Sequence, residues 1–292
     1  MNAKFKNLIS TVFPLIGIVI ITVLINKDIL EFFNTSILYM CVVSIFAIQW
    51  ICFIPSYIYQ TENYFDLTGS ITYVGISITI IILNNNLDFR TLLIGLLVII
   101  WALRLGFFLF YRIQKKGFDS RFKEITPDFF RLLMTWTLQG VWIFLTFSAG
   151  LVAMSSTQKT PIDIYLIAGL LIWIIGFSIE IIADRQKQIF RSNPDNKNTF
   201  ITSGLWSWSR HPNYFGEIIL WIGIFTISIP VLSGWQYLTF ISPIFVFVLL
   251  AYISGIPLLE KAADAHWGTS SSYKIYRQNT SILIPFPPKK SN

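Results

Sequence analysis

The chain is dominated by apolar runs, most of them about twenty residues long with few or no charges, enough for an α-helix to cross about 30 Å of membrane hydrocarbon. Charged residues make up only 13% of the chain, against about 25% in a typical soluble domain. The sequence therefore predicts an all-α, polytopic transmembrane helical bundle. The expected spans are residues 8–26, 37–59, 67–83, 91–111, 132–153, 163–183, 214–233 and 238–257. The third run is short and polar, which puts the count at seven or eight.

The basic residues fall mainly on one side of this predicted topology. With the N-terminus and the even-numbered loops on that side, it receives 18 lysines and arginines, whereas the other side receives three. Cytoplasmic loops of membrane proteins carry an excess of these residues. We therefore expect both termini, and the polar segments 112–131, 184–213 and 258–292, on the cytoplasmic side. Topology and anionic lipid then explain the net charge of +7 without a nucleic-acid partner.

Ionisable residues lie in or beside the cytoplasmic ends of three predicted spans: Arg104, Glu180, Asp184 and Glu217. Charged groups inside a bilayer are costly and usually face a bundle interior or a wet cavity. Glu180 and Asp184 are four residues apart and therefore share one helix face. Three helices would thus bring charged groups to the same depth on the same side, which favours a functional site.

Each of these residues also has a purely structural interpretation. Glu217 could complement the positive end of its own helix dipole, and the side chain of Arg104 could extend to the membrane interface. The two carboxylates of the sixth span could instead pair with Arg185 or Lys187. The sequence alone leaves these alternatives open.

A dense polar run, S-R-H-P-N-Y-F-G-E at 209–217, lies at the start of an apolar run. A residue before proline avoids the helical region and proline favours the first helical turn, so a helix should begin at the proline. Arg210 and His211 at the mouth of a helix suit an anion. Gly216 and Gly223 share one face and permit close approach of another helix or of a flat ligand.

Other familiar sites are absent from the sequence. It contains no G-x-G-x-x-G, no P-loop and no H-E-x-x-H motif. Its two histidines are 55 residues apart, and its two cysteines share one apolar run, so neither a metal site nor a disulfide is suggested. A nucleotide would therefore have to bind on helix ends and cationic side chains.

Four segments resemble membrane reductases related to steroid 5-alpha-reductases and sterol reductases, in particular a bacterial branch of that group. They are G-L-W-S-W-S-R-H-P-N-Y-F-G-E (204–217), W-A-L-R-L-G-F-F-L-F-Y-R (101–112) with the following K-K-G-F-D-S-R-F, E-I-I-A-D-R-Q-K-Q-I-F (180–190) and Y-K-I-Y-R-Q-N-T-S-I-L-I-P-F (273–286). The R-H-P-N-Y piece alone is also similar to isoprenylcysteine carboxyl methyltransferases and related phospholipid methyltransferases. The resemblance implies N-terminal transmembrane helices over 1–60 and a steroid-reductase-like transmembrane catalytic domain over 61–292.

The reductase resemblance implies NADPH as cofactor, bound among the helices from the cytoplasmic side, with Asn213 and Glu217 holding the nicotinamide amide. The residues expected around the rest of the cofactor are Arg104, Lys115, Glu180, Asp184, Lys187, Arg210, His211, Tyr214, Tyr273 and Tyr276. Glu62, with Tyr64 close by in sequence, would form a hydrogen bond with the substrate carbonyl. The family's substrate-facing tyrosine corresponds to Trp101 here. Tryptophan has no acidic hydroxyl, so this departure bears on the substrate rather than on NADPH binding.

We therefore expect an NADPH-dependent oxidoreductase acting on CH–CH groups, which reduces an alkene conjugated to a carbonyl in a steroid-like or other lipid. A hydrogen-bond donor on the carbonyl oxygen would stabilise the developing enolate. One alternative is a membrane methyltransferase that uses S-adenosylmethionine, which R-H-P-N-Y and the Glu260…Tyr273…Pro285 tail permit. Another is a non-enzymatic lipid or sterol binder. The expected setting is a bacterial inner membrane, with the site open to the cytoplasm; the oligomeric state is left open.

Overall fold

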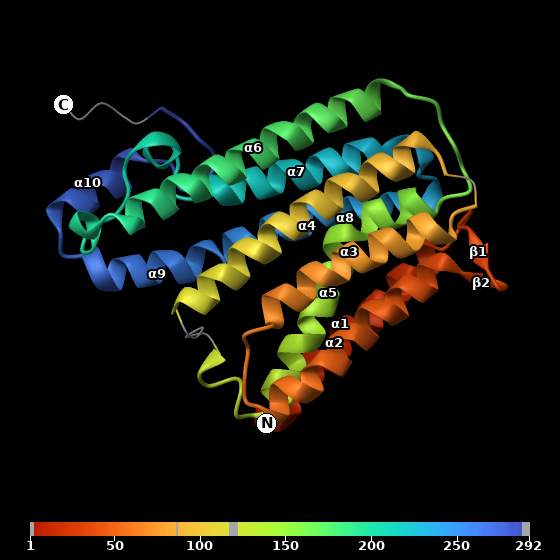
Figure 1. The fold of residues 1–292 in the computed structure, drawn as a ribbon, viewed down its shortest axis with the longest axis horizontal. Coiled ribbons are helices and arrows are strands. Elements are labelled where there is room, and N and C mark those ends of the chain that lie inside the picture. Colours follow the sequence, from red (N-terminus) through yellow and green to blue (C-terminus); the bar gives the residue numbers. More distant parts are fainter. Residues whose placement is uncertain (1–2, 86, 117–121, 288–292) are drawn as a thin grey trace. The chain divides into compact units, whose positions relative to one another are not determined.

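The computed structural model describes residues 3–85, 87–116 and 122–287, and this part of the chain is almost entirely helical (Figure 1). Its α-helices are α1 Ala3–Ile25, α2 Ile37–Ile58, α3 Phe65–Leu83, α4 Phe89–Lys116, α5 Phe129–Ser155, α6 Ile164–Ser192, α7 Pro212–Ser228, α8 Ile241–Val248, α9 Ile256–Trp267 and α10 Ser271–Asn279. A short hairpin of β1 Glu31–Phe32 and β2 Thr35–Ser36 joins α1 to α2. Residues 117–121, part of the segment that resembles reductases after α4, lie outside the described residues.

Seven helical segments in the described residues are long and apolar enough to cross a membrane. They are Ile37–Ile58, Phe65–Leu83, Phe89–Lys115, Phe129–Ser155, Ile164–Ser192, Pro212–Val231 and Gly234–Trp267, and Ile9–Ile25 is a shorter apolar helix. The predicted all-α, polytopic transmembrane bundle is therefore confirmed. Seven of the eight expected spans correspond to these segments, and the first, 8–26, corresponds to the shorter helix Ile9–Ile25. The cytoplasmic position of the two termini stays a prediction.

The described chain forms two compact units, and each is considered by itself. The first unit contains Met1–Leu166 and Ile227–Ile241, and the second contains Ile167–Thr226 and Ser242–Asn292. In the first unit, α3 lies beside α4, and α5 lies against α1 and α2 (Figure 1). α5 is the most deeply buried span, with 89% of its apolar stretch inside the protein against at most 50% for the others, so it forms the core of this unit. The predicted boundary at residue 60, between N-terminal helices and a catalytic domain, stays a prediction.

Two of the three polar residues that made the third span look weak are buried, whereas Thr79 is exposed. Thr72 and Ser77 of α3 are fully buried, so the span hides these hydroxyls from lipid. Gln49 of α2 donates from Nε2 to Thr72 Oγ1 at 3.0 Å, and Gln139 of α5 donates to the carbonyl of Phe65 at 2.9 Å. Polar side chains commonly form such bonds between helices in membranes, and here they fasten α3 to its neighbours.

Arg90, at the start of α4, is a charged residue that the fold buries completely. Its guanidinium donates to Asp163 at 2.9 Å, to the carbonyl of Pro161 at 3.2 Å and to the carbonyl of Ile227. A buried charge is tolerated when it is paired and hydrogen-bonded in this way. The arginine thereby holds together three segments of the first unit that are distant in sequence.

In the second unit, α6 and α7 touch through their backbones, because glycines remove the side chains at the contact. A Cβ built on Gly216 would lie 2.6 Å from the backbone nitrogen of Glu180, and one on Gly176 would lie 2.5 Å from that of Leu220. A Cβ on Gly223 would lie 2.7 Å from the backbone nitrogen of Trp173. The glycine spacing allowed close approach of either a helix or a flat ligand. In the structure, Gly216 and Gly223 pack against the helix α6.

The Gly223→Ala substitution should destabilise the protein by about 1–3 kcal/mol, because the new methyl group meets backbone atoms that cannot move aside like a side chain. Thermal unfolding of the purified protein in detergent would measure the loss. Gly75→Ala on α3 is the matched control, because nothing lies within 4 Å of its Cβ position. Equal melting temperatures for Gly223→Ala and the wild type would contradict the tight backbone contact.

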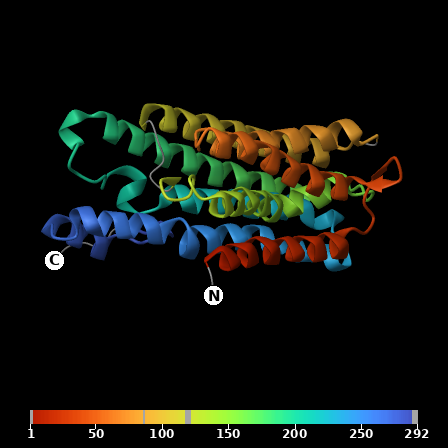
Figure 2. The same ribbon diagram turned by 90° about the horizontal axis from the view of Figure 1, so that it is seen from below.

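The last predicted span continues into a polar helix through an irregular turn. α8 is followed by a π-helical turn at Leu249–Ile253 and then by α9. In Figure 2 these three segments, drawn in blue, continue one another. Between them, Gly255 adopts φ −93° and ψ −96°, and a Cβ there would lie 2.4 Å from the carbonyl oxygen of Leu250. This turn fixes the direction of α9, which forms one wall of the cavity described next.

Candidate functional site

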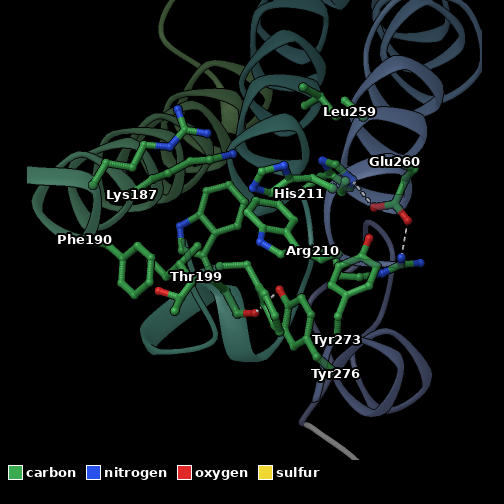
Figure 3. Close-up of a pocket in the computed structure, with 17 residues that line it drawn as sticks. Lys187, Phe190, Thr199, Arg210, His211, Leu259, Glu260, Tyr273 and Tyr276 are labelled. Atoms are coloured by element: carbon green, nitrogen blue, oxygen red, sulfur yellow. Dashed lines mark hydrogen bonds and ion pairs between the residues drawn. The ribbon is translucent and has the colours of Figure 1, made fainter. Parts of the chain in front are cut away.

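A cavity of about 390 Å³ lies within the second unit, between the end of α6, the segment that leads to α7, and the helices α9 and α10 (Figure 3). Its size falls in the range of small-molecule sites. It is lined by Lys187, Phe190, Arg191, Thr199, Phe200, Ile201, Trp206, Arg210, His211, Leu259, Glu260, Ala262, Ala263, His266, Trp267, Tyr273 and Tyr276. Polar and aromatic side chains therefore make up most of its wall.

Trp206 is the residue on which three sides of the cavity meet. It lies in the short 3₁₀ turn Gly204–Ser207 and is 3% exposed. Its indole Nε1 donates to the carbonyl of Ala183 on α6 at 2.9 Å, and its own carbonyl accepts from the hydroxyl of Tyr276 at 2.7 Å. The ammonium of Lys187 lies 4.2 Å from the ring centroid, a cation–π distance. The tryptophan thus fixes the turn, α6 and α10 to one another.

Arg210 and His211, which the sequence placed at the mouth of α7, share one carboxylate. Arg210 donates from Nη1 to one oxygen of Glu260, and His211 Nε2 lies 2.9 Å from the other. A carboxylate only accepts hydrogen bonds, so Nε2 of His211 must carry the proton. The contact brings together residues 49 and 50 positions apart in sequence, and Figure 3 shows Glu260 facing both of them.

Two nitrogen atoms of this pair have no partner among the described residues. Nε of Arg210 and Nδ1 of His211 are both buried and form no hydrogen bond there. Because His211 carries its proton on Nε2, neutral Nδ1 is an acceptor, whereas Nε of Arg210 is a donor. Leaving such atoms unsatisfied costs free energy, and both belong to residues that line the cavity. A ligand that offers both an acceptor and a donor would satisfy them.

Aromatic rings form another part of the cavity wall. Phe200 lies 5.2 Å from Tyr273, 5.4 Å from Tyr276 and 5.6 Å from Trp267, measured between ring centroids. Tyr273 is buried and Tyr276 is fixed by its bond to the tryptophan turn. Flat rings of this kind offer faces on which a planar group can stack. The cavity therefore combines cationic side chains with an aromatic surface.

The C-terminal segment is attached to the start of the polar run by several hydrogen bonds. Arg210 donates its backbone N–H to the carbonyl of Ser281 at 2.8 Å, and the Ser209 hydroxyl donates to the carbonyl of Leu283 at 2.7 Å. Phe286 donates to the carbonyl of Trp208 at 3.1 Å. Two of the four segments that resemble reductases, 204–217 and 273–286, therefore lie side by side.

The structure brings some of the predicted cofactor residues together at this cavity. Five of them line it: Lys187, Arg210, His211, Tyr273 and Tyr276. Five others lie elsewhere in the second unit: Glu180, Asp184, Asn213, Tyr214 and Glu217. Tyr214 stacks on His211 with ring centroids 5.6 Å apart, and the glycine contact places the backbone of Glu180 against α7 one residue from Glu217. Two of the three helices that were expected to bring charged groups to one level thus meet in this unit, and the convergence with Arg104 stays a prediction.

The remaining predicted residues belong to the first unit, so their meeting with the cavity stays a prediction. Glu62 lies half-buried in the turn before α3, and Tyr64 is exposed and stacks with Phe110 at 6.3 Å. Trp101 is fully buried, edge to face with Tyr73 at 5.2 Å. The other two are Arg104, whose guanidinium lies 5.3 Å from the Phe108 ring, and Lys115, exposed near the end of α4.

Several cavity residues were not among the predicted site residues. Glu260 appeared only as part of a C-terminal tail pattern, although it accepts bonds from both residues of the R-H pair. Trp206 lies inside the quoted motif, but an aromatic residue near a membrane is usually an interfacial anchor. His266 and Trp267 lie at the end of α9, beyond the last span that the sequence predicted, and no local pattern distinguishes them.

Burial lowers the pKa of His211 from its ordinary value of 6.5, in spite of the opposing carboxylate of Glu260, and Lys187 and Arg210 act in the same direction as burial. The imidazole is therefore neutral at neutral pH. Burial likewise raises the pKa of Tyr276, which keeps its hydroxyl protonated and able to donate to Trp206.

The depressed pKa of His211 should make the protein less stable in acid. As pH falls below about 6.5, the unfolded chain binds a proton on this residue that the folded chain accepts only at lower pH, so stability decreases. His211→Gln should remove this part of the loss, and His266→Gln, which removes an exposed histidine, is the matched control. Melting temperatures between about pH 8 and pH 5.5 would measure it. The same slope in His211→Gln and in the wild type would contradict the assignment.

Comparisons with known proteins give a family and one distant relative. A family model with the description "Protein of unknown function (DUF1295)" matches residues 52–280, well over half of the chain. A "Probable O-methyltransferase ustE" of Ustilaginoidea virens is 32% identical over 72 residues. That match covers 25% of this chain and 25% of the relative, so the chain spans about a quarter of the curated protein's length. No solved structure matches the chain.

Proposed function

The chain belongs to the DUF1295 family, and we propose that it is a membrane-embedded reductase that uses NADPH to reduce an alkene conjugated to a carbonyl in a lipophilic substrate. The observation that carries this proposal is the cavity of the second unit, which combines cations, aromatic rings and two buried nitrogen atoms that have no partner among the described residues. The four segments that resemble steroid 5-alpha-reductases and sterol reductases support it. We place the enzyme in a bacterial inner membrane, with the cavity open to the cytoplasm.

The charge of the cavity wall favours a ligand with phosphates. Lys187, Arg191 and Arg210 contribute three cations, and Glu260 is the one acidic residue among the described residues that line the cavity. Phosphates are bound preferentially by arginine and lysine. S-adenosylmethionine has no phosphate and carries a positive sulfonium, so this set of side chains suits it less well than NADPH.

The aromatic wall suits the adenine of the same cofactor. The rings of Phe200, Trp267 and Tyr273 offer faces for stacking a planar base, next to the cations that would hold the phosphates. A cavity of about 390 Å³ would take the adenosine and phosphate end of a dinucleotide. The nicotinamide end would extend toward α7, where Asn213 and Glu217 offer amide and carboxylate groups to its carboxamide.

The protein's part in the reaction would be positioning and the exclusion of water. When bound, NADPH supplies the hydride that reduces the β-carbon of the conjugated alkene. A donor on the substrate carbonyl would stabilise the negative charge that develops on its oxygen. Glu62 would provide this hydrogen bond if its carboxyl group is protonated, with Tyr64 and Trp101 as further candidates for contact with the substrate. The reductase resemblance also assigns Arg104 and Lys115 of α4 to the cofactor.

A second candidate is a methyltransferase that uses S-adenosylmethionine. It is favoured by the relative named as a probable O-methyltransferase and by Glu260, whose carboxylate could receive the ligand's ammonium group. The exposed apolar surface of the spans suits a lipophilic methyl acceptor as well as it suits a lipophilic alkene. Charge is therefore the property that separates the two candidates.

Calorimetry of the purified protein with NADPH and with S-adenosylmethionine would test the two candidates directly. We expect saturable binding of NADPH, because the cavity offers cations to its phosphates. Oxidation of bound NADPH by a lipophilic enone would then establish the reaction. The oxidation is measured as a loss of nicotinamide absorbance. Saturable binding of S-adenosylmethionine alone would overturn the reductase proposal.

Lys187→Gln should weaken NADPH binding about tenfold, because it removes one charge-assisted contact to a phosphate. Lys197→Gln removes an equal charge from the exposed segment after α6, outside the cavity, and is the matched control. Binding of S-adenosylmethionine should not weaken in either variant. Unchanged NADPH affinity in a folded Lys187→Gln protein would exclude this lysine from phosphate binding.

A further inference from the structure

The pair expected to bind an anion is already engaged by a carboxylate of the chain itself. Arg210 and His211 donate to different oxygens of Glu260, so the carboxylate is held on both sides in the way that two donors would hold a phosphate. The carboxylate group is also largely shielded, with the Glu260 side chain 14% exposed. These contacts place a negative charge within the cavity, beside the cations that line it.

The charges around Glu260 compensate one another. Arg277 of α10 lies 3.7 Å from the same carboxylate and donates to Asp264 at 2.7 Å. Two arginines therefore face two carboxylates, while the buried imidazole of His211 is neutral at neutral pH. A phosphate that approached Arg210 would meet the like charge of Glu260 at close range, which is repulsive.

We propose that Glu260 competes with the ligand's phosphate for Arg210 and His211, so that the phosphate binds by displacing this carboxylate. The inference rests on the proposed function, because it requires a phosphate-bearing ligand in the cavity. It adds a regulatory element to that function: the affinity of the site for anions is set by an internal counter-ion as well as by the cations of the wall.

The surroundings of Glu260 provide a second partner for the displaced carboxylate. The side chain of Arg277 is 47% exposed and lies on the helix that follows α9, so it can bind Glu260 outside the contact with Arg210. α9 itself begins after the π-helical turn at Leu249–Ile253 and Gly255. Single π-helical turns often accompany functional sites, and this one separates α9 from α8.

A purely structural role for Glu260 makes the opposite prediction. If the carboxylate only holds Arg210 and His211 in place for the ligand, removal of its charge should loosen both side chains and weaken binding. If it competes with the phosphate, removal of its charge should strengthen binding. The sign of the change in affinity therefore decides between the two roles.

The test compares Glu260→Gln with Asp264→Asn by calorimetry of the full-length protein, with NADPH and with inorganic pyrophosphate as the phosphate-only probe. Glutamine keeps a hydrogen-bond acceptor and removes the charge, so both probes should bind about tenfold more tightly, a value reduced for solvent screening. Asp264→Asn removes an equal charge one turn along α9, outside the cavity lining, and should change affinity less than about twofold. S-adenosylmethionine should gain nothing from Glu260→Gln.

The outcomes separate this inference from the proposed function. If wild-type protein binds NADPH and Glu260→Gln binds it equally or more weakly, the inference is wrong and the proposed function stands. If neither protein binds NADPH or pyrophosphate, both fall. Should the glutamine variant not fold, Glu260→Asp, whose shorter side chain weakens the contact with Arg210, must bind pyrophosphate more tightly than the wild type for the inference to hold.

Discussion

The backbone contact between α6 and α7 is the constraint on which the second unit depends. Because Gly176, Gly216 and Gly223 carry no side chains, the two helices approach to a distance that any Cβ would prevent. This contact fixes the height of the first turn of α7 relative to the end of α6. The R-H pair just before α7 is thereby held in the same unit as Lys187, near the end of α6. The 3₁₀ turn before α7 is bound to α6 through the hydrogen bond from Trp206 to the carbonyl of Ala183. Trp206 also lines the cavity.

The sequence predicted the spans well because hydrophobicity is a property of each segment alone. A run of apolar residues is expected to become a membrane helix whatever its neighbours are, and the start of α7 at Pro212 follows from local backbone preferences. The third span shows the limit of this approach. Whether Thr72 and Ser77 weaken a span depends on which side they face, and only the packing of α3 against α2 and α5 decides that.

Only part of the candidate site could be predicted, because the sequence shows local patterns but not which distant residues meet. Arg210 and His211 could be identified because helix mouths attract anions, and Tyr273 and Tyr276 through a resemblance of segments. Glu260 was not recognised as a site residue, since its role comes from a contact across 49 positions of sequence. Local patterns contain no information about such a pair. The meeting of the first-unit residues with this cavity is a further long-range relation that the sequence suggests through resemblance alone.

The negative charge of Glu260 would have opposite effects on the binding of the two candidate ligands. For a dinucleotide with phosphates, the carboxylate would be a competitor for Arg210 and His211. For S-adenosylmethionine, with its ammonium and sulfonium groups, the same carboxylate would be an attractive partner. The surrounding cations do not share this ambiguity, since Lys187 and Arg191 favour phosphates and disfavour a cationic ligand. The proposed ligand is therefore anionic, and the largely shielded carboxylate of Glu260, 14% exposed, would limit its affinity.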